Sequence, residues 1–178
     1  MSKTLQLLPA CLLFFVAACQ PANKQQQLTQ AQRLAPVQRM GTPESLILKG
    51  VKVPAGYDLF FSSGLVAPVA DTTVANSPER YGGRTYEQSM AALNRLKNVL
   101  LEAGLGMKDV ISLKAYIVPD PELGGTMDFE GWNNAYKAFF ANAENPEKVA
   151  RTTLGVATLA RQGIMVEVEA IAVYPPNQ

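Results

Sequence analysis

Apolar side chains recur along this 178-residue chain with two different periods. Over residues 85–103 they return every three or four positions, which predicts a helix with one apolar face. From Val110 to Val118 they alternate with polar residues, which predicts a strand with one buried face. By the same criteria we predict a second helix at 129–141 and further strands at 45–53, 57–63, 150–156 and 164–174.

The resulting order is β-β-α-β-α-β-β. Helices that alternate with strands favour a mixed sheet with both helices on one face, an α+β two-layer sandwich. Polar side chains nevertheless occur on strands that are otherwise apolar, namely Lys114, Tyr116, Glu167 and Glu169. We therefore expect the sheet face opposite the helices to be covered by another subunit or to carry a site.

Local signals predict where the first helix begins and ends. Thr85 and Gln88 have the spacing of a capping box, in which two side chains satisfy free backbone N–H groups reciprocally. Gly104 or Gly106 supplies the stop. Pro54-Ala55-Gly56 predicts a turn between the first two strands.

The N-terminus carries an apolar run from Leu5 to Ala18, preceded by Lys3 as its only charge. The run is short for a membrane span, and we predict a signal peptide over residues 1–18. Small residues before Cys19 resemble the lipobox of bacterial lipoproteins, which implies a lipid on that cysteine and an anchor to a membrane. Gln20 in the next position suggests a periplasm-facing protein of the outer membrane in the bacterial cell envelope. The alternatives are an ordinary signal peptide and a short anchor.

The segment after the apolar run has little periodic apolar content. Residues 20–42 contain seven glutamines and two prolines. We predict that residues 19–43 are a lipidated cysteine followed by a flexible tether, and that 44–178 form one folded domain. A content of 48% hydrophobic and 17% charged residues suits a domain with a real core.

Charge and composition exclude several classes of function. Loss of the signal peptide would remove Lys3 from the 16 basic residues, leaving them balanced against 15 acidic ones. Nucleic-acid binding through phosphates usually needs a basic excess, so we expect no nucleic-acid partner. The chain has no histidine, which excludes an imidazole base and the usual zinc sites. We expect neither a metal nor a cofactor.

Candidate chemistry lies near the C-terminus. Glu167 and Glu169 are two positions apart on one predicted strand and share a face, and Arg151 and Thr153 share a face of the preceding strand. An arginine can grip a carboxylate through two parallel hydrogen bonds. If these strands pair, the partner of Arg151 is either a ligand carboxylate or a glutamate in a cross-strand ion pair, and spacing leaves both open.

From Glu44 to Tyr174 the chain resembles the reactive-intermediate (enamine/imine) deaminase family, also called the Rid or L-PSP endoribonuclease family. The resemblance implies a chorismate-mutase-like fold assembled as a homotrimer with three clefts between subunits. The residues that carry it are Ser62-Ser63-Gly64, Asp128-Phe129, Asn133, Tyr136, Phe139-Phe140, Ala150-Arg151-Thr152-Thr153 and Val166-Glu167-Val168-Glu169-Ala170-Ile171-Ala172.

The resemblance also implies hydrolysis of 2-imino or enamine acids to 2-keto acids and ammonia, without a cofactor. Arg151 would hold the substrate carboxylate and Glu167 would position the attacking water. Thr153 would contribute backbone contacts, while Ser63 and Asn133 would line the same cleft.

The chain departs from the family pattern at two places. Ile47 stands where the deaminases usually have a tyrosine, and Lys148-Val149 replaces a common proline. The missing hydroxyl keeps a rival open, a non-catalytic envelope protein that binds small carboxylates in the same cleft. Endoribonuclease activity is disfavoured by the balanced charge and the lack of histidine.

Overall fold

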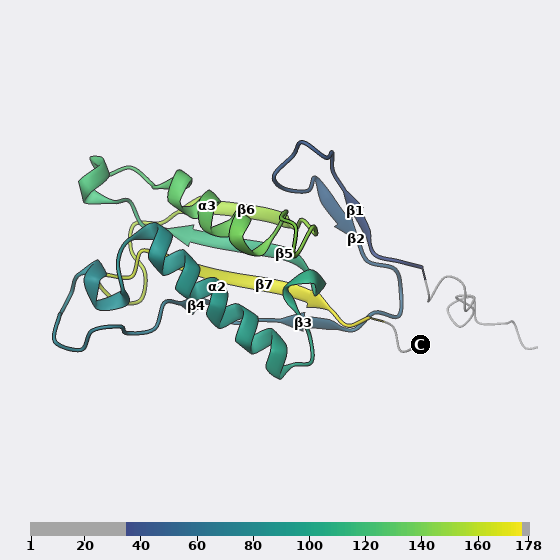
Figure 1. Cartoon of the computed structure of the whole chain (residues 1–178), viewed down its shortest axis with the longest axis horizontal. Helices are drawn as coiled ribbons and strands as arrows, with labels where there is room; N and C mark the ends of the chain where they lie inside the picture. The colour runs from purple at the N-terminus through teal and green to yellow at the C-terminus, as the bar shows by residue number, and fades with distance from the viewer. Residues whose placement is uncertain (1–34, 176–178) are drawn as a thin grey trace, which may run out of the picture.

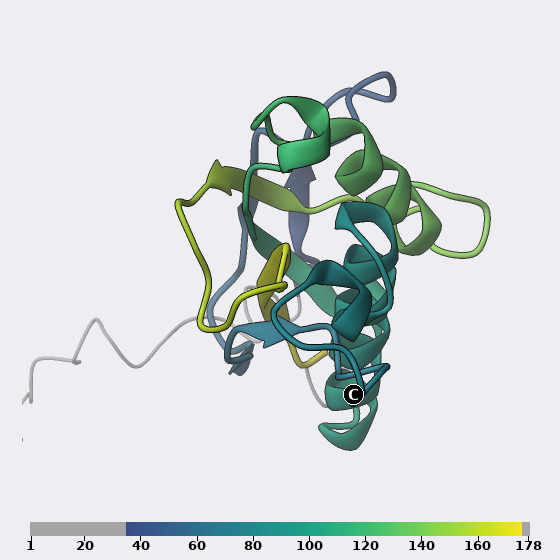
Figure 2. The ribbon, with the colours of Figure 1, turned by 90° about the vertical axis from the view of Figure 1, so that its left-hand side faces the viewer.

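Two helices lie on one face of a five-stranded sheet in the computed structural model, which describes residues 35–175 (Figures 1 and 2). The helices are α2 (Thr85–Glu102) and α3 (Phe129–Phe139). The strands are β3 (Leu59–Phe61), β4 (Leu65–Val66), β5 (Val110–Ile117), β6 (Ala150–Gly155) and β7 (Val166–Val173). Single 3-10 turns occupy Pro78–Tyr81, Met107–Asp109 and Pro121–Leu123. The signal peptide predicted for residues 1–18 and the lipidation predicted at Cys19 lie outside the described residues.

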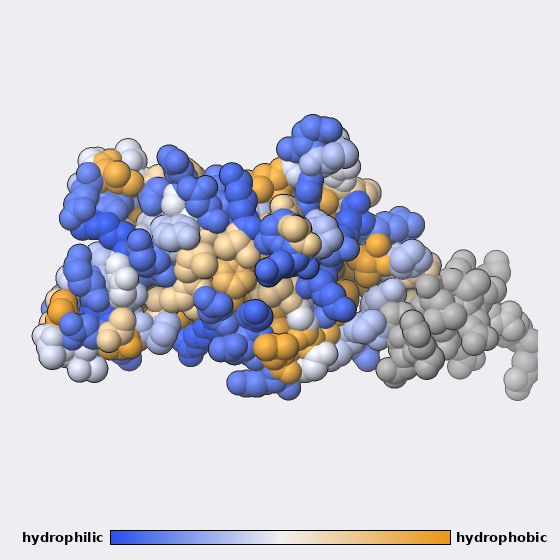
Figure 3. All heavy atoms as spheres, in the orientation of Figure 1, coloured by the Kyte–Doolittle hydropathy of each residue, from blue (hydrophilic) through white to orange (hydrophobic). Residues whose placement is uncertain are grey.

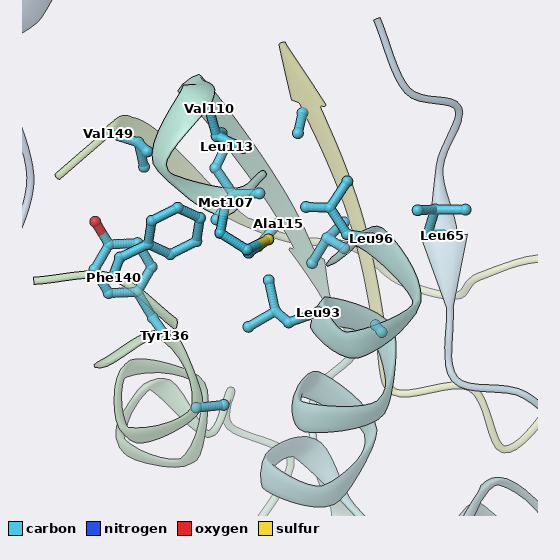
Figure 4. Packing of buried hydrophobic residues seen from close by; sticks show 14 of the residues in the cluster. Leu65, Leu93, Leu96, Met107, Val110, Leu113, Ala115, Tyr136, Phe140 and Val149 are labelled. Carbon is cyan, nitrogen blue, oxygen red and sulfur yellow. The ribbon is translucent and has the colours of Figure 1, made fainter. Parts of the chain in front are cut away.

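The predicted α+β two-layer sandwich is confirmed, and its sheet has the order β3-β7-β5-β6. β4 continues along the same edge of β7 as β3, β6 runs parallel to β5, and β7 runs antiparallel to β5. Leu113 and Ala115 of β5 lie beneath the helices with Leu93 and Leu96 of α2 (Figure 4). The alternation read from the sequence thus correctly separates the buried face from the polar one. On the helix side of the molecule, polar residues surround a central strip of weakly apolar ones (Figure 3).

The N-terminal part of the fold differs from the prediction. Gln38–Met40 (β1) pairs with Gly50–Lys52 (β2) in a separate two-stranded sheet. The tether predicted up to residue 43 is therefore wrong at 38–40, and the strand predicted at 45–53 is shorter.

Arg39 is the physical reason for this difference. It donates hydrogen bonds to the carbonyls of Val110, Lys148 and Lys108 at 2.9, 2.5 and 2.8 Å. It also forms a 2.7 Å ion pair with Glu147. A single arginine in a glutamine-rich segment forms no periodic pattern, so the sequence could not predict these contacts.

The start of α2 is capped by a different residue from the one predicted. Glu87, not Gln88, accepts the free backbone N–H, that of Arg84, at 3.0 Å. Gln88 is fully buried, donates to the Gly163 carbonyl at 2.7 Å and accepts the Met165 N–H at 2.8 Å. It therefore ties α2 to the loop that leads into β7.

Candidate functional site

Arg151 lies on β6, at one edge of the sheet, and faces the helix layer. Its register partner is Leu113, a core residue, so both side chains point towards the helices. Its Nη2 atom donates a 2.8 Å hydrogen bond to Oδ1 of Asn133 on α3. Its guanidinium carbon lies 4.6 Å from the ring centre of Tyr136 and 5.7 Å from that of Trp132.

The Arg151 guanidinium lacks an anionic partner within residues 35–175. Its Nη1 atom is buried and has no hydrogen-bond acceptor there, and no ion pair in this part of the chain includes it. Burial lowers the pKa of Arg151, and the Tyr136 phenol opposes that change. A buried donor without an acceptor costs roughly 1–3 kcal/mol.

Thr153 follows Arg151 on the same face of β6. Its hydroxyl accepts a 3.1 Å hydrogen bond from the indole Nε1 of Trp132. The sequence reasoning did not select Trp132. The signal that could have found it is the position of this single tryptophan beside Asn133 and one turn before Tyr136.

Glu167 lies on β7 and faces the open side of the sheet. It is opposite Tyr116 of β5 and Val66 of β4. A Cβ atom added at Gly64 would lie 1.7 Å from Oε1 of Glu167. The carboxylate therefore occupies the space that any other residue at position 64 would need.

The three residues of the Ser62-Ser63-Gly64 motif have different positions in the sheet. Ser62 takes the ladder position, because its N–H donates to the Ala170 carbonyl at 2.9 Å and its hydroxyl accepts the Ala170 N–H at 2.8 Å. Ser63 is exposed beside Gly64, on the edge of the sheet opposite β6. Its side chain is thus free to face a neighbouring molecule.

The two glutamates of β7 have different surroundings. Oε1 of Glu169 accepts hydrogen bonds from Lys114 at 2.6 Å and from the Tyr116 hydroxyl at 3.1 Å. The hydrogen bond from Lys114 is the largest cause that lowers the pKa of Glu169. Glu167 is in no ion pair of residues 35–175. Of the two carboxylates, only Glu169 is therefore held by a cation in this range.

Arg151 and Glu167 do not meet within one protomer. Their strands do not pair, because β5 lies between β6 and β7. Two strand spacings separate the backbones by about 10 Å, and the side chains point to opposite faces of the sheet. The alternative of a cross-strand Arg–Glu ion pair is therefore wrong.

The two departures from the family pattern have structural counterparts. Ile47 packs partly buried against the core, and its carbonyl accepts the Ser45 hydroxyl. Val149 is fully buried, and its carbonyl accepts the Leu48 N–H at 3.0 Å. The segment around Ile47 therefore runs beside the start of β6 but brings no hydroxyl at position 47.

Two further classes of site receive no support from residues 35–175. Among them, no group of three acidic or cysteine side chains is placed to hold a metal ion. Nor is any helix in this range both long and apolar enough to span a bilayer.

Replacement of Gly64 by alanine is expected to disturb the Glu167 half of the site without unfolding the domain. The added methyl group overlaps only the far end of a flexible side chain, so the carboxylate moves and the sheet does not. We expect any turnover that depends on the position of the Glu167 carboxylate to fall by about 10-fold or more. Urea unfolding should stay close to wild type. Alanine at Gly106 is the control for adding a methyl group to a glycine outside the site, because its backbone is extended (φ −132°) and an added Cβ meets only Oδ2 of Asp109, at 3.8 Å.

Comparisons with known proteins agree with this fold. Residues 58–174 match the family model described as Endoribonuclease L-PSP. The chain belongs to this family. A Rid-family protein of unknown function from Yersinia pestis is 23% identical over 76% of this chain and 98% of its own, with a TM-score of 0.58. TdcF from E. coli, solved with bound serine, is 25% identical over 77% of this chain and 98% of its own, with a TM-score of 0.49.

Membership of the L-PSP family supports a general role in imine or enamine metabolism or an endoribonuclease-like activity. The fold and the positions of Arg151 and Glu167 bear on which of these roles the chain performs.

Proposed function

We propose that this protein is a cofactor-free hydrolase that converts reactive 2-imino or enamine acids into 2-keto acids and ammonia. The observation that carries the proposal is the partly buried guanidinium of Arg151, which is in no ion pair of residues 35–175. A positive charge held by aromatic rings and an amide, not by a carboxylate, remains available to a ligand anion. The substrate carboxylate supplies that anion.

The chemistry needs orientation more than a strong base, because a protonated 2-imino acid is already electrophilic. Arg151 holds the carboxylate, and Glu167 accepts a proton from a water molecule as its oxygen bonds to C2. The carbinolamine formed takes that proton on nitrogen, and Glu167 accepts the hydroxyl proton as the C–N bond breaks. The departing ammonia takes this proton from Glu167 and leaves as ammonium. The carbonyl of the 2-keto acid is left, and water is the only co-reactant consumed.

A second copy of the chain completes the cleft in this proposal. Arg151 lies on edge strand β6, whereas Ser63, Gly64 and Glu167 lie at the opposite edge, where β3 and β4 flank β7. A two-fold dimer would place like edges together. A head-to-tail contact places unlike edges together, and such contacts form a ring when the rotation between successive copies closes. The homotrimer implied by the family resemblance is a ring of this kind, with three clefts.

The location that we propose is the bacterial cell envelope. A lipid on Cys19 would anchor the domain to a membrane, with the outer membrane favoured by Gln20. Incorporation of a labelled fatty acid that is lost in Cys19→Ser tests this part separately.

The activity is tested by generating 2-imino acids with an amino-acid oxidase and trapping them with semicarbazide. The protein should lower the rate of adduct formation in proportion to its concentration. The same rate with active and heat-denatured protein would contradict the deaminase proposal.

One observation favours a second function, which is binding of small carboxylates without turnover. Ile47 brings no hydroxyl to the segment beside β6, so water or substrate handling is weakened. Stabilisation of the protein by 2-keto acids, with no effect on the semicarbazide assay, would support this alternative. Endoribonuclease activity has less support, because the chain has no histidine and balanced charge.

A further inference from the structure

Trp132 contacts both β6 residues that belong to the proposed cleft. Its indole Nε1 donates to the Thr153 hydroxyl at 3.1 Å, and its ring centre lies 5.7 Å from the Arg151 guanidinium carbon. Trp132 is fully buried and is the only tryptophan in the chain. One side chain of α3 therefore contacts two successive residues on the inner face of β6.

Two neighbours of Trp132 complete the surroundings of the guanidinium. Tyr136 lies one helical turn later on the same face of α3, with ring centres 6.4 Å apart and an interplanar angle of 55°. Its ring centre is 4.6 Å from the guanidinium carbon of Arg151. Asn133 accepts from Nη2 at 2.8 Å. These three side chains fix the direction of the guanidinium without neutralising its charge.

We propose that Trp132 is the positioning residue of this site. It holds β6 against α3 through Thr153 and gives the Arg151 guanidinium a ring to lie against, so that the guanidinium keeps one orientation for the substrate carboxylate. The inference rests on the proposed function of the cleft. Because it concerns the carboxylate grip and not the attack of water, it predicts an effect on KM and on ligand Kd with kcat little changed.

Two substitutions at Thr153 separate positioning from packing. Thr153→Val keeps the shape of the side chain but removes the acceptor of the indole N–H. Thr153→Ser keeps the acceptor but removes a methyl group. We expect valine to weaken pyruvate binding and raise KM by about 10-fold, the effect of one lost buried hydrogen bond, and serine to stay within about 2-fold of wild type. The reverse order, or equal values, would overturn the inference.

A double-mutant cycle with Trp132→Phe tests the same hydrogen bond from its other end. The double variant with Thr153→Val should bind pyruvate no more weakly than Trp132→Phe alone, because both changes remove one interaction. Fully additive losses would overturn the assignment. Tyr86→Phe, on the exposed face of α2, controls for the loss of an aromatic polar group. If Trp132→Phe does not fold, the Thr153 pair still decides.

The fluorescence of Trp132 gives a spectroscopic signature that a purely structural role would not produce. Titration with pyruvate should change the emission in a saturable way, and Arg151→Ala should abolish the change. If calorimetry detects pyruvate binding but the emission does not change, the Trp132 ring does not contact the occupied site and the inference is contradicted.

The positioning role and the deaminase proposal fail separately. If the protein binds pyruvate but does not hydrolyse imines, and Thr153→Val lowers the affinity for pyruvate, the Trp132 inference stands and the deaminase proposal is overturned. If the protein hydrolyses imines and Thr153→Val has the same KM as wild type, only the Trp132 inference is overturned. Absence of both binding and turnover overturns both.

Discussion

Arg151→Ala is expected to lower kcat/KM for imino-acid hydrolysis by about 100-fold, mainly through KM. The guanidinium offers charge-assisted hydrogen bonds to a carboxylate and is in no ion pair of residues 35–175. Loss of such a bond to a charged group costs about 3 kcal/mol, which corresponds to about 100-fold in binding. Arg151 binds the carboxylate equally in the bound substrate and in the transition state, so its loss raises KM while kcat changes little. Semicarbazide trapping with varied substrate concentration measures both parameters.

Arg161→Ala is the matched control for this experiment. Arg161 is exposed, and it precedes β7 on the loop that Gln88 holds. It should behave as wild type. Equal progress curves for Arg151→Ala and wild type would contradict the role of Arg151. A loss that appears only in kcat would place Arg151 in the reaction step and not in carboxylate binding.

Glu167→Gln should have the complementary effect, a fall of about 100-fold or more in kcat with KM close to wild type. Glutamine fills the space above Gly64 but accepts no proton from water, and proton transfer by a placed group contributes about 100-fold or more. Glu169→Gln is the control on the same strand face, because Glu169 is already hydrogen-bonded to Lys114 and Tyr116. Turnover by Glu167→Gln at the wild-type rate would remove Glu167 from the mechanism.

The sheet and its helices followed from the sequence because each depends on local periodicity. The alternation in β5 separates Leu113 and Ala115 from Lys114 and Tyr116, and the structure places the two sets on opposite faces. The prediction of the helix cap was less accurate. Glu87 and Gln88 are adjacent in the sequence, and only the burial of Gln88 shows that it belongs to the core. The role of Arg39 depends on contacts distant in the chain and left no local signal.

The candidate site was predictable as a set of residues but not as a geometry. Arg151 and Glu167 stood out from their neighbours, and the unequal roles of Glu167 and Glu169 agree with the contacts of Lys114 and Tyr116. The sequence could not show that β5 separates β6 from β7, because strand order depends on long-range pairing. In the proposed ring, this separation puts Arg151 and Glu167 of one cleft on different copies of the chain.

Subunit mixing tests the central claim, a cleft completed between copies, most directly. Equal amounts of Arg151→Ala and Glu167→Gln protein, unfolded together and refolded, form mixed rings. In these rings a cleft is intact when one variant supplies Arg151 and the other supplies Glu167. At substrate concentrations well below the wild-type KM, each variant alone should be nearly inactive. The mixture should then recover about one quarter of wild-type activity, since about one cleft in four combines the intact halves. Activity no greater than the sum of the two variants, in rings shown to have mixed, would contradict a cleft shared between copies.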